Sequence, residues 1–179
     1  MLNLFKKKSS EPKVNDKIWM AQADKWKACA ELTRTNPDSF FIAWFDETRQ
    51  QLEDIFTKEN LAIQNILSAR EAGTHHLKNK TFVFIEHYPL RSREQALFTS
   101  LQPADILIYS ALDEPLFMHF GGEKIIQMMK QLGMKETESI ENSLLSNAIR
   151  NAQEKIEKKV LADHSSCSQK DWLSKNYLS

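Results

Sequence analysis

The sequence predicts an α/β fold, a parallel sheet of about four to five strands flanked by helices, with a helical C-terminal extension. Short runs rich in β-branched and aromatic residues alternate with longer segments whose apolar residues recur at helical spacing. The apolar runs are continuous, which is typical of strands covered on both faces. Strands that alternate with helices favour parallel pairing, because each helix returns the chain to the same edge of the sheet.

Each expected element rests on its own pattern. The strands are predicted at residues 40–45, 61–66, 81–86 and 105–109. The helices between them are predicted at residues 22–34, from 46 onward, at 68–78 and at 92–101. Asp46 is expected to cap the second helix, and Ser92 with Gln95 has the form of a capping box for the fourth.

The last third of the chain is predicted to be helical. A helix over 123–132 is expected to end at Gly133, and a longer one is expected over 139–160. The apolar stripe of the longer helix follows the helical period, with charged residues on the other face. The expected organisation is a flexible basic tail (1–15), an α/β domain (16–120), a helical extension (121–161) and a polar C-terminal tail (162–179).

Composition argues against several classes of function. The 24 basic and 24 acidic residues cancel, so no overall field attracts nucleic acid, and we expect no nucleic-acid partner. No apolar run is long enough to cross a bilayer and no signal peptide is recognisable, which predicts a cytoplasmic protein. The N-terminal tail, with Leu2, Leu4 and Phe5 beside three lysines, is expected to make at most weak membrane contact.

No metal site is predicted. Cys29 and Cys167 are far apart in the sequence, and His164 with Cys167 supplies only two of the three or four ligands that zinc requires. Asp113 and Glu114 stand before Pro115, at the start of an expected helix. Acidic residues are favoured there, so we interpret this pair as capping residues.

Residues 108–125 and the helix that follows resemble a family. The run from Ile108 to Ile125, then Met128-Met129 and Ala148 to Glu157, resembles the end of the second nucleotide-binding domain of the SecA preprotein translocase ATPases and the start of their scaffold helix. Looser similarity extends back to residue 16. The resemblance implies a bacterial protein with the P-loop NTPase-like fold of a helicase C-terminal half, and a link to protein transport.

The motifs of ATP hydrolysis are missing from this sequence. It has four glycines and no GxxxxGK loop, although glycines are needed to wrap a phosphate closely. After Gln95, where the family has an arginine-rich segment, the chain reads Phe98 to Pro103 without an arginine. The resemblance therefore implies a pseudo-ATPase, and we expect no cofactor and no ATP binding.

A polar cluster is predicted at the end of the third strand. Glu86 and His87 are candidate catalytic residues, because open parallel sheets often place ligands at this edge. Arg91 and Arg93 are candidate anion-binding residues nearby. The alternative interpretation is that the cluster is purely structural, with Glu86 paired to an arginine and His87 hydrogen-bonded to a loop.

The predicted function is that of a non-catalytic protein-interaction or regulatory module, which the resemblance links to preprotein translocation. The expected docking element is the helix 139–160 or the surface that faces the first motor domain in SecA, with Arg150, Glu154 and Lys158 as partner-binding candidates. The partner is expected to be part of the translocation machinery or a second copy of this chain. Two alternatives stay open: a small enzyme of unassigned reaction that uses the Glu86, His87, Arg91 and Arg93 cluster, and a nucleotide- or nucleic-acid-binding helicase-like domain.

Overall fold

The structure is a computed structural model that describes residues 13–74, 80–101 and 105–178. These residues form five strands: β1 (Lys13–Trp19), β2 (Phe40–Ala43), β3 (Ile66–Ser68), β4 (Phe82–Phe84) and β5 (Asp105–Ala111). They also form eight helices: α1 (Gln22–Thr35), α2 (Asp46–Lys58), α3 (Ala69–Ala72), α4 (Arg91–Leu101), α5 (Pro115–His119), α6 (Gly122–Gln131), α7 (Ser143–Glu157) and α8 (Gln169–Asn176).

The described strands form one parallel sheet in the order β1-β5-β4-β2-β3. The longest pairing joins β1 to β5, from Lys13 opposite Asp105 to Trp19 opposite Ala111. The predicted α/β fold with a parallel sheet is therefore confirmed. Because all strands run the same way, the segments that follow β4 and β5 leave the sheet at one edge, which is where open sheets of this kind bind ligands.

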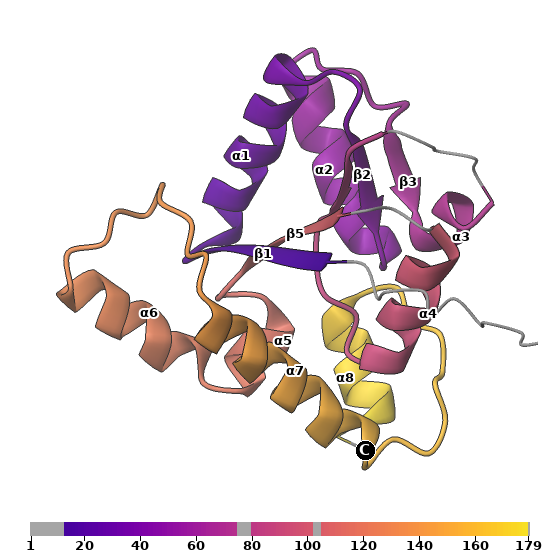
Figure 1. The fold of residues 1–179 in the computed structure, drawn as a ribbon, viewed down its shortest axis with the longest axis vertical. Helices are drawn as coiled ribbons and strands as arrows, with labels where there is room; N and C mark the ends of the chain where they lie inside the picture. Colours follow the sequence, from indigo (N-terminus) through magenta and orange to yellow (C-terminus); the bar gives the residue numbers. More distant parts are fainter. Residues whose placement is uncertain (1–12, 75–79, 102–104, 179) are drawn as a thin grey trace, which may run out of the picture.

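Helices cover both faces of the sheet (Figure 1). α1 and α2 pack on one face, where Phe41 and Val83 are fully buried. α3 and α4 pack on the other, where Ile42 and Phe84 are fully buried. Neighbouring residues of β2 thus point into different cores, which is why an apolar run without alternation was needed to build this strand.

The remaining helices, α5 to α8, gather on the side where the strands end, in the lower part of Figure 1. α6 and α7 pack against Ile18 and Leu112, which lie in and just after the two paired strands β1 and β5. α8 inserts Trp172 and Leu173 beside Phe45, which follows β2. This second set of contacts joins the helical extension to the sheet.

Two strand predictions need correction. The strand expected at 61–66 is wrong for most of its length, since only Ile66 lies in β3. β1 was not predicted at all, because polar residues such as Asn15 and Lys17 interrupt its apolar positions. β1 is an edge strand of the described sheet, where Lys13 remains exposed and Asn15 and Lys17 remain half-buried.

Helix ends also differ from expectation. Phe45, not Asp46, is the N-cap of α2, and it makes no side-chain capping bond. Ser92 lies inside α4, which begins at Arg91, so Ser92 is not at the N-cap position that a capping box requires. A capping box forms instead at α3, between Ser68 and Glu71. α7 is shorter than the predicted helix 139–160 at both ends, since it begins at Ser143 and ends at Glu157.

The two predicted tails of the chain compare differently with the structure. Most of the predicted N-terminal tail, residues 1–12, lies outside the described residues, while Lys13 to Asn15 belong to β1. Within 162–178 the chain forms α8, whose Trp172 is fully buried. No helix in the described ranges combines the length and apolar character that crossing a membrane requires.

We predict that Trp172→Ala lowers the free energy of unfolding by about 3–5 kcal/mol, because it empties a buried aromatic site. The substitution also removes the hydrogen bond from Trp172 Nε1 to Asp163 at 2.8 Å. Urea denaturation measures the change, and Leu161→Ala, at a fully exposed position, is the control. A loss below about 1 kcal/mol would show that α8 is not part of the cooperative fold.

Candidate functional site at the carboxyl edge of the sheet

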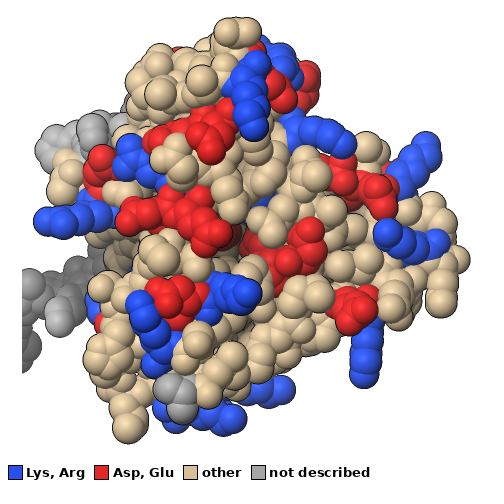
Figure 2. Space-filling view, turned by 180° about the vertical axis from the view of Figure 1, so that it is seen from behind, with Lys and Arg blue, Asp and Glu red and all other residues tan. Residues whose placement is uncertain are grey.

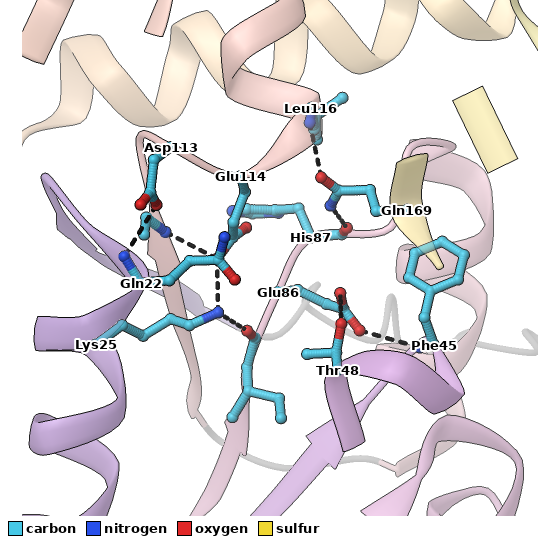
Figure 3. Close-up of polar contacts among 12 residues, drawn as sticks. Gln22, Lys25, Phe45, Thr48, Glu86, His87, Asp113, Glu114, Leu116 and Gln169 are labelled. Carbon is cyan, nitrogen blue, oxygen red and sulfur yellow. Dashed lines mark hydrogen bonds and ion pairs between the residues drawn. The ribbon is translucent and has the colours of Figure 1, made fainter. Parts of the chain in front are cut away.

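The candidate site lies at the C-terminal ends of the parallel strands, which we call the carboxyl edge of the sheet (Figure 3). Glu86 and His87 follow β4, and Asp113 and Glu114 follow β5. α1 carries Lys25 to the same place, so its ammonium group lies among these acidic side chains. The site is therefore built from segments that are far apart in the sequence and meet because the strands are parallel.

Lys25 is a fully buried lysine that joins three elements. Its Nζ lies 2.6 Å from Glu114 Oε1 and donates to the Ile85 carbonyl at 2.7 Å. The same Glu114 oxygen accepts a hydrogen bond from the Ala111 amide at 2.9 Å. Burial raises the pKa of Glu114, although the charge of Lys25 acts to lower it. The pair ties α1 to the ends of β4 and β5.

Asp113 has a structural role at the same edge. Its Oδ1 accepts a hydrogen bond from the Gln22 amide at 2.9 Å, at the start of α1. Asp113 therefore satisfies an amide of α1, not of the helix that follows it in sequence. Glu114 is the N-cap residue of α5, but it makes no side-chain capping bond there.

Glu86 is 3% exposed, and its carboxylate binds the start of α2. It accepts hydrogen bonds from the amides of Trp44 and Phe45 at 2.9 and 3.0 Å, and from the Thr48 hydroxyl at 2.6 Å. Burial raises the pKa of Glu86 to about 7, against the lowering effect of the Thr48 hydrogen bond. Glu86 thus supplies the acceptor at this helix start that was expected from Asp46.

His87 is also 3% exposed and lies between two carboxylates. Its Nδ1 is 3.0 Å from Glu94 Oε1, and its Nε2 is 3.3 Å from Asp16 Oδ1. Burial lowers the pKa of an imidazole, but the two carboxylates outweigh it and raise the pKa of His87 to about 10. At neutral pH the ring is therefore an imidazolium. Gln153 of α7 donates to the other oxygen of Glu94 at 2.8 Å.

α8 closes the edge from outside. Gln169 accepts a hydrogen bond from the Leu116 amide at 2.7 Å and donates to the His87 carbonyl at 3.0 Å. These two bonds bridge the start of α5 and the segment after β4 (Figure 3). The buried backbone groups at the edge are therefore paired with a side chain of the C-terminal helix.

The four-residue cluster predicted from the sequence is brought together only in part, since His87 and Arg91 line one cavity and Glu86 and Arg93 do not. Arg91 Nη1 lies 2.8 Å from Glu154 on α7, and Arg93 Nε lies 2.8 Å from Asp163 in the segment before α8. Among the described residues, Glu86 forms no ion pair with either arginine. Its partners are backbone amides and a hydroxyl, so the expected Glu86–arginine pair is absent from the described part of the chain.

The three predicted partner-binding residues of α7 differ in their surroundings. Glu154 is half-exposed and holds Arg91, so it contributes to the packing of α7 on α4. Arg150 and Lys158 are exposed, and neither forms an ion pair with another described residue. Of the three predicted residues, Arg150 and Lys158 therefore have charges that are available to another molecule.

Sequence analysis missed several members of the site. They are Asp16, Lys25, Glu94, Gln153 and Gln169. For Lys25 a signal was available, because it lies four residues before Cys29 and therefore on the buried face of α1. The glutamines carried no such signal, since their burial depends on the docking of α7 and α8.

Comparison with known proteins identifies one similar region. No family model matches the chain. One stretch of the chain is similar to SecA. Over 55 residues it is 44% identical to protein translocase subunit SecA of Campylobacter hominis, which covers 31% of this chain and 6% of that protein. SecA of Maridesulfovibrio salexigens is also 44% identical over 55 residues, or 7% of its length. SecA of Acidithiobacillus ferrooxidans is 42% identical over 55 residues, or 6%.

The similarity is local. A SecA-like region of about a third of the chain is confirmed, and the chain spans only a small fraction of the SecA proteins that it matches. The residues of the buried edge are therefore interpreted from their own contacts.

We predict that stability falls as pH rises from about 7.5 to 9, because folding raises the pKa of His87 from 6.5 to about 10. A group with a raised pKa stabilises the fold below its unfolded value, and this contribution is lost as pH rises through the folded value. One proton gives a slope of at most about 1.4 kcal/mol per pH unit. Urea denaturation across this range measures it.

The controls separate His87 from other titrating groups. His87→Gln should flatten the slope between pH 7.5 and 9, whereas His119→Gln, at an exposed position, should leave it unchanged. Glu86, whose pKa burial raises to about 7, adds a similar fall at lower pH, between its ordinary value of 4.5 and 7. An identical slope in His87→Gln and the unmodified chain would contradict the assignment.

We predict that Lys25→Met destabilises the protein by about 3–5 kcal/mol, since it leaves the Glu114 carboxylate buried without a partner charge. The double variant Lys25→Met with Glu114→Gln should recover much of that loss, because no buried charge remains. Chemical denaturation of both single variants and the double variant gives the coupling energy. Additive effects would show that the 2.6 Å contact does not couple the two residues.

Proposed function

We propose that this chain is a non-catalytic relative of the second motor domain of SecA that binds a protein partner in preprotein translocation. In this proposal it acts in the cytoplasm and needs no cofactor. The observation that carries the proposal is the state of the carboxyl edge. The buried charged residues there contact other groups of the protein, while exposed basic residues of α7 form no ion pair within the described chain.

The edge contacts support a structural role for Glu86 and His87. A general acid or base must lie within hydrogen-bond reach of a substrate proton. Both oxygens of Glu86 accept hydrogen bonds at the start of α2. The Nδ1 atom of His87 lies 3.0 Å from Glu94, and its Nε2 atom faces Asp16 at 3.3 Å. α8 covers this edge through Gln169, so a substrate could reach Glu86 only if these contacts broke.

α7 offers a charged surface for the partner. Its acidic residues Glu154 and Glu157 turn toward α4, where they meet Arg91 and the Ser92 amide. Lys155 of α7 and Lys158 at its C-cap are exposed and lie three residues apart, on one side of the helix; we name them the basic face of α7. A basic face on a chain of zero net charge favours a partner with a complementary acidic surface.

The rear face of the molecule carries charges of both signs (Figure 2). Figure 2 shows acidic side chains gathered near the centre of the rear view, with most of the basic side chains toward its outline. Such a surface repels the phosphates of a nucleic acid, whose affinity depends on clustered Lys and Arg. The basic face of α7 is thus a local feature, which is suited to a protein partner of limited area.

We predict that Lys155→Glu with Lys158→Glu weakens recovery of the partner in a pull-down from bacterial extract at least about tenfold, through reversed electrostatics at the contact. Lys58→Glu with Arg70→Glu makes the same change of charge on exposed positions of α2 and α3, and should bind normally. Arg150 is left unchanged in both variants. Equal recovery by the two double variants would contradict docking through α7.

The non-catalytic part of the proposal has a separate test. Incubation with millimolar Mg-ATP should release no inorganic phosphate, and the unfolding temperature with Mg-ATP should not exceed that with pyrophosphate at matched ionic strength. Ligands that bind the folded state raise the unfolding temperature by mass action. A saturable shift together with ATP turnover would replace this proposal by the nucleotide-binding alternative. Turnover that disappears in Glu86→Gln, with the fold intact, would favour the enzyme alternative instead.

A further inference from the structure

A cavity of about 710 Å³ lies between β1, α4 and α7. Its volume falls within the range of about 300–1,000 Å³ that is usual for small-molecule sites. Val14, Phe98, Ile108 and Ile149 supply apolar lining, and polar groups from α4 and α7 complete it. The cavity is separate from the buried contacts of Glu86 and Lys25, which do not line it.

The cavity is richer in cationic than in anionic side chains. Lys13, His87, Arg91 and Arg150 line it, against the carboxylates of Asp16 and Glu94. Both carboxylates are already engaged by His87, at 3.3 and 3.0 Å. His87 therefore neutralises part of the negative charge in the lining. Arg91 is paired with Glu154, whereas Lys13 and Arg150 form no ion pair with a described residue.

Two arginines from different helices meet at this cavity. Arg91 is held in place by Glu154 at 2.8 Å. Arg150 is exposed and has no ion pair with any described residue. A guanidinium presents parallel donors that match the two oxygens of a phosphate or carboxylate. Arg150 thus retains its guanidinium donors among the residues that line the cavity.

The hollow around Arg150 extends beyond the main cavity. A second depression of about 320 Å³ shares Asp16, Ser146 and Arg150 with it. The start of α7 also borders this depression, since Asn142 and Ser143 line it. The positive end of the helix dipole adds to the field in this depression near Asn142 and Ser143. Arg150 is the cationic side chain common to both hollows, and Asp16 is the anionic one.

We propose that the cavity between α4 and α7 binds a small organic anion, with Arg150 and Arg91 contacting its phosphate or carboxylate oxygens. The apolar lining provided by Phe98 and Ile149 would hold the uncharged part of the molecule. This site does not depend on a protein partner at α7. Both phosphate esters and polycarboxylates have the required oxygens, so the experiment uses one probe of each kind.

Isothermal titration calorimetry with pyrophosphate and with citrate tests the proposal, with the ionic strength matched by sodium chloride. We expect saturable binding of at least one probe. Arg150→Ala should weaken it about tenfold or more, as the loss of one charge-assisted hydrogen bond predicts. Arg91→Lys keeps the charge but loses the paired donors, and should also weaken binding. Lys58→Ala, which removes an exposed cation of α2 outside the cavity lining, should not.

The outcomes decide the proposal in either direction. Preference for pyrophosphate over citrate would assign the site to phosphate-bearing ligands, and the reverse preference to carboxylates. Absence of saturable binding with both probes would overturn the site. Equal affinity of Arg150→Ala and the unmodified chain would also overturn it, provided that urea denaturation shows both to be folded. Because the pull-down variants retain Arg150, failure here leaves the proposed partner binding untouched.

Discussion

The ion pair between Lys25 and Glu114 is the contact on which the arrangement of the carboxyl edge depends. It is fully enclosed, so each charge would be costly without the other, and its two backbone contacts fix where the helix and the strand ends must lie. Asp113, the residue before Glu114, binds the start of the same helix. Two successive acidic residues after β5 thus set the position of α1. A buried polar network of this kind specifies geometry, because only one arrangement satisfies its members.

The sheet was predictable because its strands are apolar on both sides. Phe40 to Ala43 and Phe82 to Phe84 carry that signal in the sequence itself. β1 could not be recognised in the same way. Its neighbour on the sheet is β5, and its outer side is met by Ile140, which pairs with Ile18 in the antiparallel sense. A strand of this type is defined by pairing with residues about 90 and 120 positions away, and local pattern does not report such contacts.

The candidate site was predictable in place but not in composition. Glu86 and His87 were found because they end a recognisable strand. Their partners come from α1, α2, α4 and α7, and burial of a polar side chain depends on how those helices dock. Arg91 and Arg93 were grouped because they are close in sequence. Residues two apart on a helix point in different directions, so one reaches α7 and the other reaches the segment before α8.

α7 connects the buried edge to the surface. Arg150, Glu154 and Lys158 are spaced by about one helical turn and were expected to share one surface. Glu154, however, forms an ion pair with Arg91 of α4. On the inner side, Gln153 reaches Glu94, the carboxylate that holds His87. A shift of α7 would therefore disturb both the Arg91 contact and the imidazolium network. Any molecule that binds the basic face of α7 or the cavity beside it acts on a helix that is hydrogen-bonded directly to the polar core. A displacement of α7 alone would therefore be sufficient to couple binding at its surface to the contacts of His87 at the carboxyl edge.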